Sequence, residues 1–377
     1  MTGFQLLGIG TAVPEHFIQQ SEAADFATTC LAGQADGEKA ASLVRALYRR
    51  SGVQTRHSVV LDSSSDASPA TQTFYEPSEM DLDRGPGTAA RMHCYESRAP
   101  ELATAAAKKA IAQAGIDVSL VTHLVTVSCS GFSAPGVDLE LIKRLGLSST
   151  VARSHIGFMG CHGALNGLRV AKAFTDADPK AVVLVCAVEL CTLHHQYGWV
   201  PEEIVANSLF ADGAAALVGC RGEASPSPDD RPPLPALIDN FCSVIPETEH
   251  MMSWRIGDAG FRMTLSPEVP GVITASLPAL LNGFLQRHGL RRDEIEGWAI
   301  HPGGPRILKA CCDVAGLNAD QIQTSTSVLA EFGNMSSPTV LFILDRLLQQ
   351  GTNGPIVMMG FGPGLNVEIA LLNSAIH

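Results

Sequence analysis

The sequence is poor in charged residues and has no excess of basic ones. Only 17% of its residues are charged, and the formal net charge is −12. General nucleic-acid binding draws its affinity from lysine and arginine side chains on phosphates, so an acidic chain is a poor candidate for it. We therefore expect no nucleic-acid partner, although a small basic patch for a phosphorylated ligand stays compatible with this composition.

Export signals and membrane spans are also lacking. The N-terminal residues MTGFQLLGIGTAVPEH do not place an apolar stretch behind a basic one, as a signal peptide does. Apolar runs such as AVVLVCAVEL stop well short of the ~20 residues that a transmembrane helix needs. The expectation is a cytoplasmic protein without stable membrane insertion.

The ten cysteines form no metal-binding pattern. There is no CxxC pair and no Cys/His spacing suited to zinc, so no metal is expected. Without an export signal, most of the cysteines are expected to be reduced and buried as small apolar side chains. A catalytic role for any one of them needs its own argument.

What the chain does have is apolar content and a regular alternation of elements. Its 377 residues are 46% hydrophobic and include 35 glycines, which suits a large core in two domains or one duplicated domain. Short apolar runs predict buried strands at residues 122–129, 181–190, 297–301 and 356–362. Amphipathic stretches predict helices at residues 100–116, 167–177 and 339–351. This alternation predicts an α/β fold of layered sheets covered by helices.

Two polar stretches interrupt the alternation. Residues 61–91 carry Ser, Pro and acidic residues without a period, which predicts a long surface excursion. Residues 221–236 read as a solvated linker that separates an N-terminal part, residues 1–220, from a C-terminal part, residues 237–377. The two parts close on the similar segments FADGAAALVG and FGPGLNVEIALL, a weak sign of internal duplication.

Cys161 is the first candidate for chemistry. An apolar, strand-like run leads to Gly160, and a stretch of helical period follows Cys161. This predicts a thiol at the N-terminus of a helix, where unpaired N–H groups and the helix dipole favour the thiolate and lower the pKa. A small buried residue at a helix start is the alternative interpretation.

A cysteine nucleophile needs a partner, and two later segments offer one. His301 follows the predicted strand at 297–301 and precedes Pro-Gly-Gly, the kind of place where α/β folds carry catalytic groups. Asn334 could donate a hydrogen bond to a developing oxyanion. The alternatives are a core histidine and an N-cap for the next helix, and the residues alone do not choose between them.

The segments around these residues resemble one family when they are taken together. GCHGALNGLRVA, AIHPGGPRIL and EFGNMSSPTVLFIL, closed by GFGPGLNVE, match the type III polyketide synthases, relatives of chalcone and stilbene synthases, in order and wording. SCSGFSAPGVDLELIKRLGL and SLFADGAAALVG extend the resemblance over nearly the whole chain. It implies a thiolase fold of two similar halves in five αβαβα layers, working as a homodimer.

The resemblance also implies the chemistry. Cys161 would accept the acyl group, and His301 would keep it ionised. His301 and Asn334 would together hold the thioester oxygen of malonyl-CoA while CO2 leaves, and the resulting enolate would attack the acyl group on Cys161. Acyl-CoA and malonyl-CoA are then the substrates, and no metal or redox cofactor is required.

Several positions that line the family's reaction cavity can be matched. Phe210 corresponds to a Phe between the CoA tunnel and the cavity, and Ala134 to the position that reaches into the partner's cavity. Four further positions depart from the plant pattern, namely Cys129, His194, Trp254 and Met263. Ser336 keeps the Ser of that pattern. A large Trp254 predicts a small cavity, whereas small Cys129 and Ala134 predict an alkyl tunnel, and this conflict stays open.

A CoA tunnel needs basic residues at its mouth. The run LVRALYRRSGVQTRH supplies Arg45, Arg49, Arg50 and Arg56, and Arg306 follows HPGGP. A solvated helix face is the alternative interpretation for each of them.

The leading hypothesis is an enzyme that loads an acyl starter and releases a pyrone or a cyclised phenolic, with a preference for an aliphatic starter and a short, lactonised product. A single-round ketoacyl synthase or an acyl-joining enzyme of the same fold is the first alternative. A Cys-His-Asn thiol hydrolase and a catalytically silent CoA-binding scaffold are the others.

Overall fold

The protein's computed structural model describes residues 3–31, 37–66, 68–78, 83–222 and 233–373. Nine strands form one hydrogen-bonded series, which we describe as an N-terminal and a C-terminal sheet joined where the first residues of β1 pair with β8. The N-terminal sheet has the order β5-β4-β6-β7-β1, built from β1 (Phe4–Ala12), β4 (His123–Ser128), β5 (Ala152–Gly157), β6 (Val182–Leu190) and β7 (Asp212–Arg221). The C-terminal sheet has the order β8-β13-β12-β11, built from β8 (Ala236–Val244), β11 (Gly297–Ile300), β12 (Ile356–Gly362) and β13 (Asn366–Asn373).

The two sheets repeat one pairing pattern. In the N-terminal sheet β4 runs parallel to β6, β6 antiparallel to β7, and β7 antiparallel to β1. In the C-terminal sheet β11 runs parallel to β12, β12 antiparallel to β13, and β13 antiparallel to β8. The similar segments FADGAAALVG and FGPGLNVEIALL therefore lead into equivalent strands, β7 and β13.

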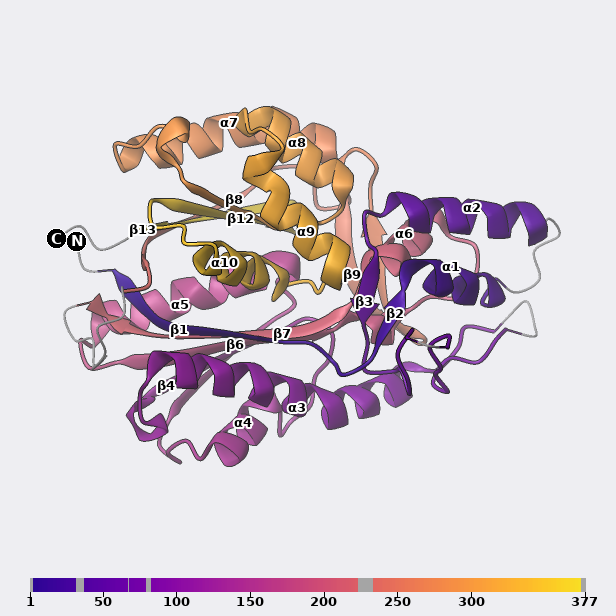
Figure 1. Ribbon diagram of the computed structural model, residues 1–377, viewed down its shortest axis with the longest axis horizontal. Helices are drawn as coiled ribbons and strands as arrows, with labels where there is room; N and C mark the ends of the chain where they lie inside the picture. The colour runs from indigo at the N-terminus through magenta and orange to yellow at the C-terminus, as the bar shows by residue number, and fades with distance from the viewer. Residues whose placement is uncertain (1–2, 32–36, 67, 79–82, 223–232, 374–377) are drawn as a thin grey trace.

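Helices complete five layers, which Figure 1 shows from top to bottom. The middle layer is α5 (Gly163–Ala177) and α10 (Thr339–Gln349), whose buried side chains form one core with both sheets. The outer layers are α3 (Thr88–Ala114) with α4 (Val137–Leu145), and α7 (Val269–Arg287) with α8 (Pro305–Ala315). This arrangement is the αβαβα thiolase fold, as the sequence predicted.

The apolar pattern explains these layers. Almost every residue of β6 is buried, because helices cover both faces of its sheet. Helix α3 instead presents a face of alanines, among them Ala99, Ala103 and Ala107, to the outer face of the N-terminal sheet. Small side chains let this long helix lie close to β1 and β7.

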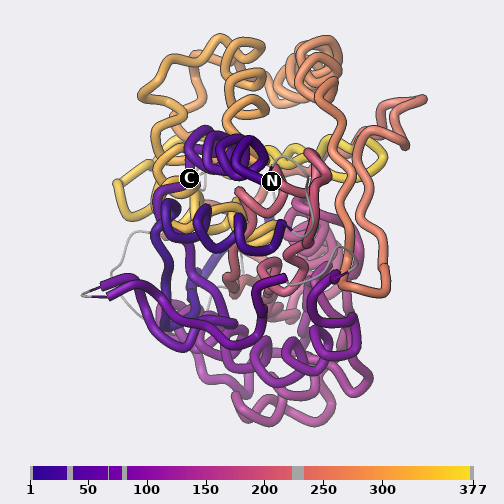
Figure 2. The backbone as a smooth tube through the Cα atoms, turned by 90° about the vertical axis from the view of Figure 1, so that its right-hand side faces the viewer, coloured from indigo at the N-terminus to yellow at the C-terminus, as the bar shows by residue number. Residues whose placement is uncertain are grey.

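A smaller group of elements lies at one end of the layers, towards the viewer in Figure 2. It contains α1 (Gln20–Thr29), α2 (Gly37–Arg50), α6 (Pro201–Leu209), the short strands β2 (Phe17–Gln19) and β3 (Thr55–His57), and the hairpin β9 (Met252–Gly257) with β10 (Gly260–Leu265). The remaining elements are α9 (Gln323–Phe332) and the 3-10 turns η1 (Val118–Leu120), η2 (Gly160–His162), η3 (Cys191–His194), η5 (Arg292–Glu294) and η6 (Asp320–Ile322).

The prediction of a surface excursion over residues 61–91 was partly wrong. Helix α3 already begins at Thr88, and Arg91 and Tyr75 are buried. The guanidinium group of Arg91 donates hydrogen bonds to the carbonyls of Leu193 and His195, each at 2.8 Å. The polar composition of this segment gave no sign that part of it is buried. Its buried polar groups pack against the interior because they are hydrogen-bonded there.

The structure also bears on two further predictions, the lack of membrane spans and the position of the linker. Helix α7 is the single helix in the described ranges that is long and apolar enough to cross a membrane. Its residues Ile273, Leu277 and Leu281 are buried against the C-terminal sheet, as in a core helix. Most of the linker predicted at 221–236 lies outside the described residues, between the end of β7 and the start of β8.

Candidate active site

Cys161 lies at the turn between β5 and α5, as the sequence predicted. It belongs to η2, directly before α5 begins at Gly163. Gly160 has a φ of +76°, and a Cβ there would lie 2.5 Å from Cδ of Pro363. Only glycine allows this backbone to approach the loop after β12 so closely. The segments GCHG and GFGPG therefore meet in space.

His301 lies at the end of the strand β11, which neighbours β12. It follows β11, and its N–H donates to the carbonyl of Met359 in β12 at 2.8 Å. On the other side, η2 packs on β12, where a Cβ on Gly360 would lie 3.0 Å from that of His162. The nucleophile turn and His301 thus flank the C-terminal end of one strand. Both ring nitrogens of His301 are buried without a hydrogen-bond partner in the described structure.

Asn334 is not a helix cap. Helix α10 begins five residues later, at Thr339, and Pro338 occupies its N-cap position. The side-chain oxygen of Asn334 accepts a hydrogen bond from the N–H of Ser336 at 2.8 Å. This leaves the amide N–H groups of Asn334 available, and Asn334 acts to lower the pKa of the Cys161 thiol. The oxyanion-donor interpretation fits this orientation, and the cap interpretation was wrong.

Burial has the largest effect on the pKa values of Cys161 and His301. It raises the pKa of Cys161 to about 11, while hydrogen bonds from Ser336 and Asn334 act to lower it. Burial also lowers the pKa of His301 to about 3, with a smaller contribution from His162. The expectation that the helix N-terminus lowers the thiol pKa was wrong for the free enzyme, because desolvation outweighs the dipole in a water-excluded pocket.

Three cysteines line a small cavity next to the nucleophile turn. Cys129, Cys161 and Cys191 all line a space of about 30 Å³, together with the predicted residues Phe210, Trp254, Met263 and Ser336. Burial raises the pKa of Cys129 and of Cys191 well above the ordinary value. Cys161 is the one of these three that has side-chain donors, from Ser336 and Asn334, to stabilise a thiolate. Cys129 receives only a backbone donor, the N–H of Gly160 at 3.1 Å, so side-chain donors distinguish Cys161.

Glu189 was missed by the sequence analysis. It lies fully buried at the end of β6 and also lines this cavity. One carboxylate oxygen accepts from the N–H groups of Cys129 and Ser130, at 2.9 and 3.0 Å, and the other from the hydroxyl of Ser337 at 2.9 Å. Burial raises the pKa of Glu189 to about 6, although these donors counteract it. A single acidic residue at the end of AVVLVCAVEL was the only available signal.

A cluster of aromatic side chains closes the small cavity on one side. Trp254 on β9 faces Met263 on β10, and its indole N–H donates to the carbonyl of Cys129 at 2.8 Å. The ring of Phe210 meets that of Trp254 edge-on, with centroids 5.9 Å apart. His194 stacks on Phe261 at 4.2 Å and meets Trp254 edge-on at 5.3 Å.

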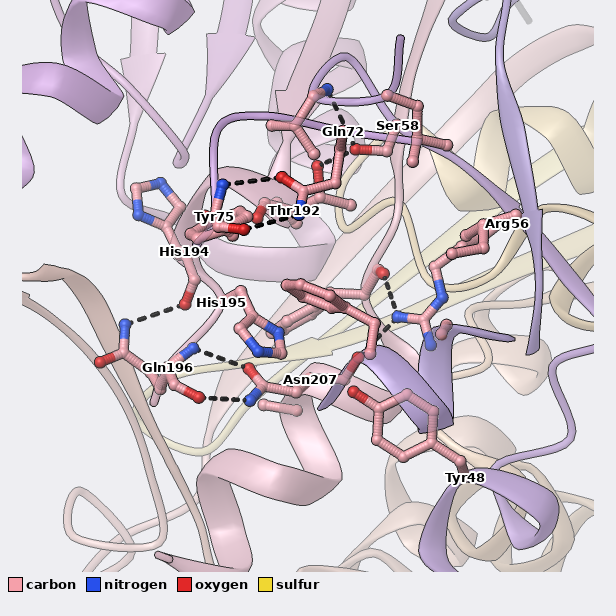
Figure 3. A pocket seen from close by; sticks show the side chains of 18 of the residues that line it. Tyr48, Arg56, Ser58, Gln72, Tyr75, Thr192, His194, His195, Gln196 and Asn207 are labelled. Carbon is pink, nitrogen blue, oxygen red and sulfur yellow. Dashed lines mark hydrogen bonds between the residues drawn. The ribbon is translucent and has the colours of Figure 1, made fainter. Parts of the chain in front are cut away.

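A much larger cavity of about 550 Å³ lies beyond this aromatic group. The residues that border both cavities, and that we call the partition, are Cys191, Phe210, Trp254 and Met263. The larger cavity therefore lies directly behind the side chains that wall off Cys161, whereas Ala134 is exposed and lines neither cavity of its own chain. Figure 3 shows the larger cavity and the polar residues around it.

Comparisons with known proteins agree with this geometry. Sequence models of the N-terminal and C-terminal domains of chalcone and stilbene synthases match residues 3–222 and 237–376. The chain belongs to the type III polyketide synthases, the family of chalcone and stilbene synthases. It is therefore a malonyl-CoA-dependent acyltransferase, and the alternatives outside this family are not favoured.

Bacterial and algal proteins are among its relatives. The alpha-pyrone synthesis polyketide synthase-like Pks18 of Mycobacterium tuberculosis is 31% identical over 96% of this chain and 88% of its own length. The 1,3,6,8-tetrahydroxynaphthalene synthase of Streptomyces peucetius is 32% identical over 98% of this chain and 93% of its own. The crystal structure of PKS-I from the brown alga Ectocarpus siliculosus superposes with a TM-score of 0.90 at 31% identity, covering 100% and 99% of the two chains.

Type III polyketide synthases use acyl-CoA and malonyl-CoA, and a third cavity suits these ligands. It measures about 560 Å³ and is bordered by Arg50, Arg306 and the Gly303–Gly304 pair that follows His301. Helix α8 begins next to it, at Pro305, so its free N–H groups add to the positive potential there.

The other predicted arginines lie elsewhere. Arg45 forms an ion pair with Asp25 at 2.7 Å, and neither Arg45 nor Arg49 lines the third cavity. Arg56 is buried, and its guanidinium donates to the carbonyls of Asn207 and Phe210 at 2.6 and 2.9 Å. Its role is structural. In the described ranges no group of three or more His, Cys, Asp or Glu side chains could hold a metal ion.

We predict that Arg50→Ala and Arg306→Ala each raise KM for acyl-CoA about fivefold, because each charge near a phosphate contributes about 1 kcal/mol at a surface site. Arg49→Ala is the matched control on the same helix and should leave KM within twofold. Steady-state kinetics at two salt concentrations provide the measurement, since the effect should shrink as salt rises. Equal KM values for all three variants would contradict the assignment of this cavity.

Proposed function

We propose that Cys161 carries the acyl chain of this synthase and that His301 and Asn334 act on both substrates. The observation that supports this most is the convergence of groups at the thiol. Ser336 and Asn334 act on the thiol of Cys161, and His301, on the other side of β12 from the nucleophile turn, keeps two buried ring nitrogens without a partner among the described residues. Buried polar groups without partners are rare in folded proteins and mark places where a ligand supplies the missing partner.

Loading requires a proton acceptor for the thiol. Because His301 is neutral, it has one lone pair, and it takes the Sγ proton as the sulfur attacks the thioester carbonyl of the starter. The carbon–sulfur bond to CoA then breaks, and the departing CoA thiolate takes that proton from His301. The products are acyl-Cys161 and free CoA.

Extension requires hydrogen-bond donors for a developing oxyanion. The N–H groups of neutral His301 and Asn334 donate to the thioester oxygen of malonyl-CoA. The bond to the carboxylate breaks, CO2 leaves, and its electron pair forms the enolate. The enolate carbon attacks the acyl carbonyl, and the sulfur of Cys161 leaves as a thiolate. No general-base carboxylate is needed near the enolate, and Glu189 is occupied by the five donors that surround it.

For the starter we propose an aliphatic acyl group and a pyrone-type product. The cavity at Cys161 holds only about 30 Å³, roughly the space of one water molecule, so an acyl chain needs additional room. The cavity beyond the partition offers that room, and its inner lining includes the apolar side chains of Ala23, Phe26 and Val60. Homodimer formation, with Ala134 reaching into the partner's cavity, is part of the same proposal.

The direct test is product formation from purified protein. Incubation with aliphatic acyl-CoAs, p-coumaroyl-CoA and labelled malonyl-CoA should give labelled pyrones with the aliphatic starters, as mass spectrometry of the extracts would show. Turnover of p-coumaroyl-CoA with no product from any aliphatic starter would contradict the proposed starter. A product with a single added two-carbon unit would instead favour the ketoacyl synthase-like alternative.

Trp254→Ala should extend the range of starters, because it removes the largest side chain of the partition. Each further CH2 that enters the cavity beyond it contributes up to ~0.8 kcal/mol, so kcat/KM should rise up to about fourfold per carbon with medium-length chains. Trp254→Phe keeps an aromatic ring at this position and serves as the matched control. An unchanged chain-length profile in Trp254→Ala would show that acyl chains do not pass this way.

A further inference from the structure

The cavity of about 550 Å³ beyond the partition extends from the protein surface to the partition. Its outer border includes the exposed residues Asp25, Pro69 and Thr71, and its inner end is the partition next to the cavity of Cys161. The elements around it are α1, the segments at residues 58–61 and 69–72, η3 and α6. It is thus a passage from the surface towards the nucleophile, distinct from the cavity that Arg50 and Arg306 border.

Most polar side chains around this cavity already have partners within the protein. The amide of Asn207 exchanges two hydrogen bonds with the backbone of Gln196, at 2.8 and 3.0 Å, and that of Gln72 does the same with Tyr75, at 2.6 and 2.7 Å. His194 donates from Nε2 to the carbonyl of Ser130 and accepts at Nδ1 from a backbone N–H. These side chains, which Figure 3 labels, are not available to a ligand.

His195 is the exception. Its side chain lines the cavity and makes no hydrogen bond among the described residues, and its Nε2 is buried. Three aromatic rings surround it, those of Phe26 at 5.6 Å, Tyr75 at 5.5 Å and Tyr197 at 6.0 Å between centroids. Figure 3 shows the imidazoles of His194 and His195 pointing in different directions from the same turn. A polar ring held in an aromatic box without a partner is a site at which a ligand can complete the hydrogen bonding.

The surroundings define the chemistry of that ligand. Burial lowers the pKa of His195 to about 3, with help from the positive charges of Arg91 and Arg56, so the ring is neutral. Glu22, Asp25 and Glu203 border the cavity as well, but Asp25 and Glu203 are paired with arginines and Glu22 accepts two hydrogen bonds. A charged ligand would therefore be buried beside His195 without a partner of opposite charge, which is costly. A neutral imidazole has one donor and one acceptor. A hydroxyl group can pair with either of them, whichever nitrogen carries the proton.

We propose that this cavity is a subsite for the distal end of the acyl chain and that His195 hydrogen-bonds a hydroxyl group there. The substrate class is then a hydroxylated acyl-CoA whose chain crosses the partition from Cys161. This inference rests on the proposed function, since it assumes acyl transfer to Cys161. His195 is a specificity-determining residue in it, remote from the reacting atoms.

The test compares two medium-chain starters of equal length, one with a terminal hydroxyl group and one without. For wild-type protein and His195→Phe, kcat/KM is measured with each starter at saturating malonyl-CoA. A neutral hydrogen bond corresponds to about fivefold in kcat/KM, so the preference for the hydroxylated starter should fall about fivefold in His195→Phe. Phe26→Leu is the matched control, because it alters the same aromatic box without removing a polar group. It should change both starters in the same proportion.

The outcomes separate this inference from the function on which it rests. If wild-type protein converts both starters equally well, or if His195→Phe keeps the wild-type preference, the hydroxyl subsite is wrong while the synthase function stands. If wild-type protein converts neither these starters nor any other acyl-CoA, the proposed function fails first. Should His195→Phe not fold, two other measurements decide. The preference for the hydroxylated starter should fall in His195→Leu, and a starter that ends in a carboxylate should be the poorest substrate of the wild-type protein.

Discussion

The close approach of the nucleophile turn to the C-terminal end of β12 is the constraint on which the site depends. Cys161 belongs to the N-terminal half and His301 to the C-terminal half, and β12 with the loop after it lies between them. Gly160 has no room for a Cβ against Pro363. A turn with any larger residue would push α5 away from this strand, and the thiol would lose its place beside Asn334.

Hydrogen bonds to the buried carboxylate of Glu189 hold the segments around the nucleophile turn together. Glu189 gathers the N–H groups of Cys129 and Ser130 and the hydroxyl of Ser337, and so ties the end of β4 to the segment before α10. Ser337 directly follows Ser336, which together with Asn334 acts to lower the pKa of the Cys161 thiol. Beside this satisfied frame, the nitrogens of His301 have no partner among the described residues, and we propose that they act on substrate.

The sequence predicted the parts of the site that lie within short segments. Cys161, His301 and Asn334 each follow a local pattern, and the repeat of β7 in β13 explains why the duplication could be noticed. Predictions failed where distant residues decide the outcome. The pKa of Cys161 follows from burial rather than from the helix next to it, and Asn334 is held by Ser336 before its helix begins.

The cavity beyond the partition could not be predicted, because its border combines residues that are far apart in the chain. Phe26, Tyr75, His195 and Trp254 come from α1, the segment before α3, the residue after η3, and β9. A local reading placed Tyr75 and Arg91 on a surface loop, although both are buried beneath it. Long-range packing and polar contacts of this kind leave no periodic signal in a sequence.

The identity of the acylated residue is the most direct test of the account, since three cysteines line the cavity at the nucleophile. The protein would be incubated with an acyl-CoA in the absence of malonyl-CoA, and the digested peptides would be analysed by mass spectrometry. The account predicts one acyl group, on the peptide that contains Cys161, and none on that peptide in Cys161→Ala. An acyl group on Cys129 or Cys191, or full acylation of Cys161→Ala, would contradict it.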